Sequence, residues 1–182
     1  GTLRYYQAIA EILTVRGAPM ARAFETVVAR MHALVGATKR RSLATAVPIE
    51  VIRAYLETDY RVHGDPAFTL RVGEASQELR ATQPSSGTKG SAYITAWNPL
   101  GQATASSENA ERHAVLEALL RDDGLAYAAG IGQHPRGEWP GEESFLVHGL
   151  TLEASVALGE RFEQNAILWA DADGVPELIL LR

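Results

Sequence analysis

Seven short strand-like runs lie between Pro48 and the C-terminus, and most are separated from the next by a turn or by a single helical segment. The strongest turn signal, Asp171-Ala172-Asp173-Gly174, joins the last two runs, at 165–170 and 176–181. Turns this short connect antiparallel strands, because a parallel connection needs a crossover of about a dozen residues or more. The order ββαβαββαββ therefore predicts an α+β fold, with a mostly antiparallel mixed sheet and packed helices.

Two helical segments between these runs have clear boundaries. Residues 107–122 carry an apolar stripe, with Ser107 placed to cap the helix and Gly124 placed to end it. Thr151 is placed to cap a second helix that extends to Glu163. Both segments are amphipathic, so each is expected to pack one face against the sheet.

The first 47 residues differ from the rest in charge and in pattern. They predict two helices, over 3–15 and 20–35, and they hold seven basic and two acidic residues, a balance of +5. Residues 48–182 hold ten basic and twenty acidic residues, a balance of −10. We therefore divide the chain into a basic helical N-terminal extension, 1–47, and an α+β domain, 48–182. Whether residues 1–19 belong to the natural domain stays open.

Composition excludes several classes of protein. Cysteine is absent, which rules out disulfides and a cysteine nucleophile and suits a reducing cytoplasm. No apolar run approaches the roughly 20 residues of a membrane helix, and a strongly acidic domain repels nucleic acid. The loop SSGTKGS (85–91) lacks the order of a phosphate-binding loop, and the His134–Glu138 spacing falls in a loop. We therefore expect a cytoplasmic protein without a metal site, and no cofactor is identified.

The stretch ITAWNPLGQATASSEN (94–109) combines a strand with a polar connection. Alternation along the strand places Tyr93, Thr95 and Trp97 on one side. Asn98 precedes Pro99, which favours an extended backbone and leaves the amide at the end of the strand. Together with Asn109 at the next helix start, this amide could bind a polar ligand. The alternative is that Asn98 only braces the turn through bonds to the backbone.

A second candidate lies in the segment EWPGEES (138–144). Alternation puts Glu142 and Ser144 on one strand face and Glu143 and Phe145 on the other. A carboxyl group on the apolar face with Phe145 would have its pKa raised by desolvation, as general acid–base catalysis requires. Glu142 and Glu143 are therefore the catalytic candidates. The alternative is that one glutamate is solvated while the other pairs with an arginine.

A third polar pair, Gln164-Asn165, opens the strand that follows the last helix. One of these side chains could point into a pocket while the other supports the end of the helix. Trp97 and Trp139 could stack on a base or a sugar, although large aromatic residues in a small domain are usually part of the core. The candidate ligand-binding residues are Asn98, Asn109, Gln164, Asn165, Trp97, Trp139 and Ser144.

Four segments together resemble a known family: AYITAWNP (92–99), SSEN (106–109), GEWPGEESFLVHGL (137–150) and FEQNAILWA (162–170). They are similar to a bacterial family known as domain of unknown function 3293, over about residues 52–181. The family name implies no activity. The resemblance implies only which positions match the pattern of the family. They are Thr95, Trp97, Asn98, Pro99, Asn109, Trp139, Glu142, Glu143, Ser144, Gln164 and Asn165.

The sequence is consistent with two functions. The leading hypothesis is a strand-end pocket that binds a small polar or nucleotide-like ligand, with hydrolysis as an open addition. In it, Glu142 or Glu143 acts as acid or base, and the amides orient the ligand. The alternative is a non-catalytic interaction module, whose basic N-terminal helices dock a partner chain or nucleic acid or form a homo-oligomer.

Overall fold

The computed structural model describes residues 45–82 and 89–182, and Thr45–Arg182 form one compact unit. The helices expected over 3–15 and 20–35 lie outside the described residues. The prediction that they dock a partner concerns the same residues and stays a prediction. No helix in the described part of the chain combines the length and the apolar character needed to cross a membrane.

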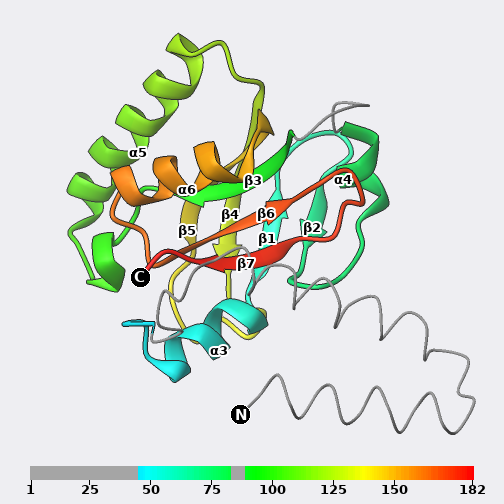
Figure 1. The fold of residues 1–182 in the computed structure, drawn as a ribbon. Coiled ribbons are helices and arrows are strands. Elements are labelled where there is room, and N and C mark those ends of the chain that lie inside the picture. The colour runs from blue at the N-terminus through cyan, green and yellow to red at the C-terminus, as the bar shows by residue number, and fades with distance from the viewer. Residues whose placement is uncertain (1–44, 83–88) are drawn as a thin grey trace, which may run out of the picture. The chain divides into compact units, whose positions relative to one another are not determined.

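The order of elements along the described chain is helix, two strands, helix, strand, helix, two strands, helix and two strands (Figure 1). A short 3-10 turn, η1 (Pro99–Gly101), follows the third strand. The elements are α3 (Ile49–Glu57), β1 (Asp59–Val62), β2 (Phe68–Leu70), α4 (Gln77–Thr82), β3 (Gly90–Thr95), α5 (Ser106–Asp122), β4 (Tyr127–Gln133), β5 (Glu142–Leu150), α6 (Leu152–Arg161), β6 (Ala166–Ala170) and β7 (Glu177–Leu180).

All seven strands join one curled, half-barrel sheet in the order β2-β1-β4-β5-β3-β6-β7, and every neighbouring pair is antiparallel. Three hairpins, β1–β2, β4–β5 and β6–β7, supply three of the six pairings. Strand β3 lies between β5 and β6, so it joins two hairpins into one sheet. The predicted α+β fold with a mostly antiparallel sheet is confirmed.

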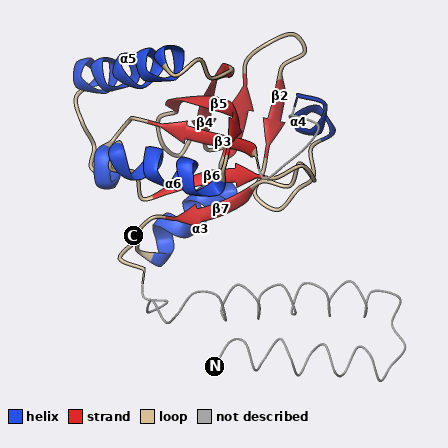
Figure 2. Ribbon diagram, turned by 45° about the horizontal axis from the view of Figure 1, so that its top comes forward, coloured by secondary structure: helices blue, strands red, loops and turns tan. Residues whose placement is uncertain are grey.

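The two faces of the sheet carry different residues because side chains alternate along each strand. One face holds Ile94, Phe145 and Val147, and helices α5 and α6 pack against it through Leu116, Leu120 and Leu158 (Figure 2). The opposite face holds a second apolar cluster: Val62, Leu70, Leu79, Tyr93, Leu146, Leu168 and Ala170. The candidate site lies on this second face.

Two helix starts test the capping predictions. The Thr151 side chain accepts a hydrogen bond from the Ala154 backbone N–H at 3.2 Å, so the predicted cap of α6 is confirmed. Helix α5 begins two residues earlier than expected, because its N-cap is Ala105 and not Ser107, and no side chain caps it. The prediction that Ser107 caps α5 is therefore wrong. Side-chain amides of Asn98 and Asn109 hold the backbone of Thr104 just before the helix, and they fix its start instead.

Strand β4 offers a matched test of how tightly the sheet is packed. A Cβ atom on Gly130 would collide with the Arg61 carbonyl oxygen and the Tyr93 hydroxyl, whereas one on Gly132 would make ordinary contacts with Thr58 and Tyr60. We expect Gly130→Ala to lower the free energy of unfolding by about 2 kcal/mol and Gly132→Ala to change it by less than about 0.5 kcal/mol. Urea unfolding measures both. Equal effects at the two positions would contradict the packing described for this strand.

Candidate functional site

A cavity of about 430 Å³ opens on the sheet face that carries Tyr93 and Leu168. Helix α3 forms one wall through Val51, Ala54 and Tyr55, and the connection from β3 to α5 forms another. Tyr93, Thr95 and Trp97 all line the cavity, as the alternation along this strand predicts. A volume of this size lies within the range of small-molecule sites.

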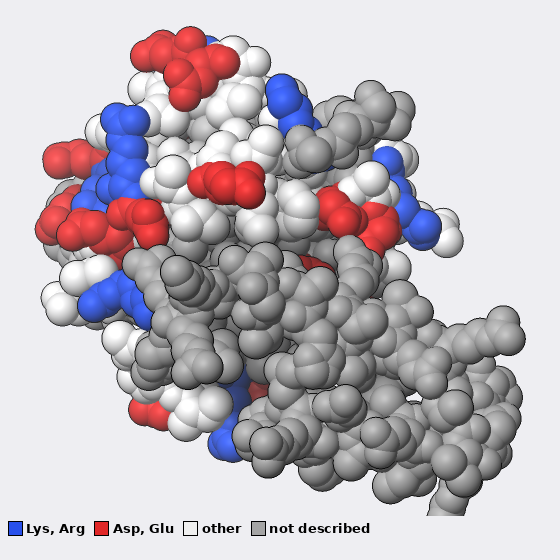
Figure 3. Space-filling view, in the orientation of Figure 1, with Lys and Arg blue, Asp and Glu red and all other residues white. Residues whose placement is uncertain are grey.

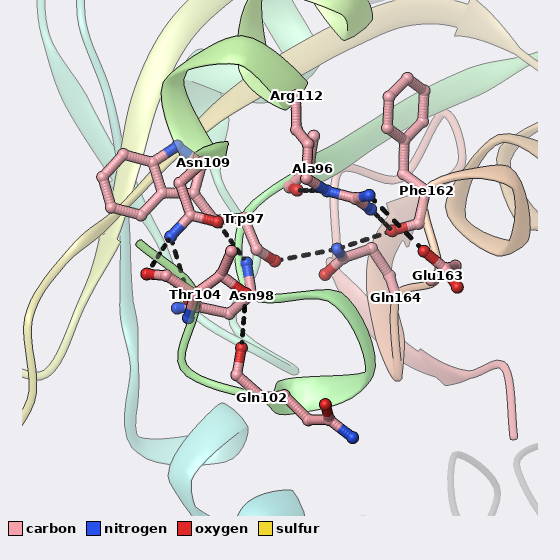
Figure 4. A network of polar contacts seen from close by, with 10 residues as sticks. All are labelled: Ala96, Trp97, Asn98, Gln102, Thr104, Asn109, Arg112, Phe162, Glu163 and Gln164. Carbon is pink, nitrogen blue, oxygen red and sulfur yellow. Dashed lines mark hydrogen bonds and ion pairs between the residues drawn. The ribbon is translucent and has the colours of Figure 1, made fainter. Parts of the chain in front are cut away.

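The Asn98 amide is the centre of a polar network beside this cavity (Figure 4). Its backbone N–H donates to Asn109 Oδ1 at 2.9 Å, and Asn109 Nδ2 donates back to Asn98 Oδ1 at 3.0 Å. Asn98 Oδ1 also accepts from the Thr104 backbone N–H at 3.1 Å. On the other side, Asn98 Nδ2 donates to Glu142 Oε1 at 2.6 Å. One side chain thus links the end of β3, the start of α5 and the start of β5.

The backbone of Asn98 differs from the sequence expectation. We expected an extended conformation before Pro99, but Asn98 has φ 48° and ψ 62°, in the left-handed region. Asparagine tolerates this region better than most residues. The hydrogen bonds of Asn98 with Asn109, Thr104 and Glu142 require the turn, and together they outweigh the steric preference that proline imposes on the preceding residue.

The two glutamates lie on opposite faces of β5, as alternation predicts, and Glu142 is the less exposed of the two. Glu142 lines the cavity on the face with Ser144, and burial raises its pKa while the hydrogen bond from Asn98 lowers it. Glu143 lies on the Phe145 face, and its side chain is 56% exposed with His113 Nε2 at 3.9 Å. His113 of α5 stacks on Phe145 with ring centroids 4.3 Å apart, whereas the Glu143 carboxylate at the start of β5 stays exposed.

Glu142 has one carboxylate oxygen committed and one available. Oε1 accepts from Asn98, whereas no residue in 45–82 or 89–182 donates a hydrogen bond to Oε2. Ser144 Oγ donates to the backbone oxygen of Glu142, not to its carboxylate. The group therefore combines burial, a fixed orientation and an open oxygen, which are the features of a carboxyl group able to exchange a proton with a bound molecule.

The remaining predicted residues divide between the cavity and its supports. Gln164, Ser144, Trp97 and Trp139 line the cavity. Gln164 Nε2 donates to the backbone oxygens of Trp97 at 3.0 Å and Phe162 at 3.2 Å, so its amide N–H groups hold the backbone. Asn165 lies behind the wall, where its Nδ2 donates to the Tyr55 hydroxyl at 3.4 Å.

Three tyrosines that we did not predict as site residues contribute hydroxyl groups to the cavity wall. The hydroxyl of Tyr60 donates to the Tyr55 carbonyl at 2.8 Å, and that of Tyr93 donates to the Arg61 carbonyl at 2.9 Å. Burial raises the pKa of both phenols, so they are neutral. The Tyr55 hydroxyl accepts from Asn165, and within the described residues its own proton has no acceptor. It is therefore free to donate into the cavity.

Arg112 is a second residue that sequence reasoning missed. Its Nε donates to the Ala96 carbonyl at 2.9 Å and its Nη2 to the Phe162 carbonyl at 2.8 Å, while Nη1 lies 3.5 Å from Glu163 (Figure 4). These carbonyls precede the segments that carry Asn98 and Gln164. Arg112 follows Asn109 by three residues on α5, which was the available signal, because residues at this spacing share a helix face.

His134 fixes the loop that brings Trp139 to the cavity. The imidazole is buried, its Nδ1 accepts from the Glu138 backbone N–H at 3.3 Å, and its ring lies 4.1 Å from the Trp139 ring. Its Nε2 lies 3.7 Å from Glu57 and 3.8 Å from Glu138. Across the described chain, no three His, Asp or Glu side chains are arranged to hold a metal ion.

The geometry defines an α+β domain with a half-buried carboxyl group in a strand-end cavity. Residues 94–167 match the model of a family described as "Protein of unknown function (DUF3293)", which confirms the resemblance over this segment. The segment contains Asn98, Asn109, Glu142 and Gln164, whereas the α3 wall lies outside it. The chain has no match among curated proteins or solved structures.

Substitutions at Asn98 separate the backbone requirement from the side-chain network. We expect Asn98→Ala to lower the free energy of unfolding by about 2–4 kcal/mol, because buried partners of the amide lose their hydrogen bonds and alanine disfavours the left-handed region. Asn98→Gly loses the same bonds but tolerates the conformation, so it should be about 1 kcal/mol more stable than Asn98→Ala. Urea unfolding of both variants measures this. An alanine variant as stable as the glycine variant would refute the left-handed conformation.

Glu142→Gln is expected to stabilise the unliganded protein. Because burial raises the folded-state pKa of Glu142, its charge destabilises the folded state as the pH rises through that pKa. At pH 7 the glutamine variant should therefore be more stable by about 1 kcal/mol, and the difference should vanish as the pH falls below about 4.3. Urea unfolding at pH 7 and pH 4 tests this, with the exposed Glu143→Gln as control. A glutamine variant that is less stable at pH 7 would show that the Asn98 bond outweighs desolvation.

Proposed function

We propose that the cavity binds a small polar or nucleotide-like ligand and that Glu142 is its acid–base group. The observation that carries the proposal is the state of this carboxyl group: it is half-buried and lines a cavity of about 430 Å³, its pKa is raised, Asn98 holds Oε1 at 2.6 Å, and Oε2 has no donor among the described residues. A raised pKa brings a carboxyl group closer to the range in which it can donate as well as accept a proton. Such perturbation in a cavity favours a functional site.

A purely structural role for Glu142 accounts for less of the geometry. A carboxylate with a purely structural role is expected to use both oxygens on protein donors, whereas only Oε1 of Glu142 has a donor among the described residues. Here the amides of Asn98 and Asn109 are used to orient the carboxyl group and to hold the turn, while one oxygen stays open. In the proposed role, Asn98 and Asn109 position Glu142, Gln164 supports the wall, and Tyr55 offers a hydroxyl donor. Hydrolysis is one reaction that such an acid–base group could serve.

A thermal-shift screen of nucleotides and metabolites tests the proposal. A ligand at about 100 times its Kd stabilises the folded protein by about 2.7 kcal/mol, which raises the Tm by several degrees. We expect at least one ligand to do so for the wild type and for Glu143→Gln, and to lose most of the shift with Glu142→Gln.

The paired variants give this screen its control. Glu142 and Glu143 are adjacent in one strand but face opposite sides of the sheet, so a loss of charge alone affects both equally. Shifts that disappear in both variants, or in neither, would place binding outside this cavity. Because Glu142→Gln is expected to be the more stable protein without ligand, a lost shift in this variant cannot be ascribed to unfolding.

A further inference from the structure

The charges around the cavity restrict the kind of ligand that it can take. Among the described residues that line it, Glu142 alone carries a formal charge, and none is Lys or Arg. Two arginines of the described residues, Arg112 and Arg182, make hydrogen bonds outside the cavity lining. Arg112 binds two backbone carbonyls, and Arg182 Nη1 donates to Asn165 at 3.5 Å.

The charged groups on the loop that carries Trp139 are paired. Glu57 and Glu138 lie near His134, and Arg136 pairs with Glu138 at 2.8 Å. On the face visible in Figure 3, both acidic and basic side chains of the described residues are exposed. A phosphate or carboxylate that entered the cavity would meet a like charge at Glu142 without a described cation to offset it, in surroundings of low dielectric constant.

The open oxygen of Glu142 defines the complementary group. Oε2 lacks a donor within the described residues, and Asn98 fixes the carboxyl group from the Oε1 side. A protonated amine or amidine satisfies this oxygen and offsets its charge in one contact. The rest of the wall suits an uncharged body, because Tyr55, Tyr60 and Trp97 present aromatic rings beside the apolar side chains of Leu168 and Leu178. Aromatic faces also attract organic cations.

We propose that the ligand of this cavity carries a protonated amine or amidine that binds Glu142, on an uncharged, partly apolar body without a phosphate or carboxylate inside the cavity. This inference rests on the proposed function, and it narrows the small polar ligand to an amine or amidine of about the size of a nucleoside. The Tyr55 hydroxyl would donate to a carbonyl or hydroxyl oxygen of the same molecule.

Matched pairs of probes that differ in charge test the inference. Tyramine is compared with 4-hydroxyphenylacetate, and benzamidine with benzoate, by isothermal titration and by chemical-shift changes in the full chain. We expect the cationic member of each binding pair to be the tighter. We also expect its affinity to fall roughly 10- to 100-fold in Glu142→Gln, as for a lost hydrogen bond to a charged group, and to be unchanged in Glu143→Gln.

The outcomes separate this inference from the proposed function. Anionic members that bind as tightly as their partners, with an affinity that depends on Glu142, would overturn the charge assignment and leave the binding site standing. Failure of every amine and amidine probe would also overturn it, and the metabolite screen would then decide whether the cavity binds another class. Cation binding that is equal in Glu142→Gln and in the wild type would overturn the assigned contact.

Discussion

The hydrogen bonds of Asn98 hold the rest of the site in place. They join three elements that the chain reaches at separate points: the end of β3, the start of α5 and the start of β5. The backbone at Asn98 adopts a left-handed conformation in which the peptide N–H and the side chain both reach Asn109. Without this turn, these hydrogen bonds could not position the start of α5 beside the cavity wall. The polar stretch after the strand is therefore more than a connection.

The environment of Glu142 lowers the stability of the fold, but it suits the proposed acid–base chemistry. Burial raises the pKa of Glu142, so its charged form costs free energy, and only one of its oxygens has a donor among the described residues. The neighbouring Glu143 shows that the same strand can carry a carboxylate at little cost by exposing it. The cost at Glu142 falls on a residue that lines the cavity. This is the pattern expected when a local cost in stability serves a binding or catalytic role.

The strand and helix order was predictable because each element depends on a local pattern. Alternation placed Tyr93, Thr95 and Trp97 together, and the Thr151 cap depended only on neighbouring residues. Which of the two glutamates is the less exposed was not predictable, because it depends on the cavity, whose walls come from segments distant in the sequence. The left-handed turn at Asn98 depends likewise on partners 11 and 44 residues away. Arg112 and Tyr55 were missed for the same reason, since their roles follow from contacts between distant segments.

The hydrogen bonds of the side-chain amides limit how many polar contacts the site can make with a ligand. Both amide protons of Asn109 are used, one toward Asn98 and one toward the Thr104 carbonyl, so Asn109 has no N–H left for a ligand. The Nε2 group of Gln164 is similarly occupied by two backbone oxygens. The sequence predicted several ligand contacts at this strand end, but the amide N–H groups of Asn109 and Gln164 are bonded to oxygens of the protein. Glu142 Oε2 has spare capacity as an acceptor and the Tyr55 hydroxyl as a donor, and the indole N–H of Trp97, which also lines the cavity, has no partner among the described residues. Recognition by so few polar groups in a largely apolar wall depends on the charge and shape of the ligand more than on the number of its hydrogen bonds.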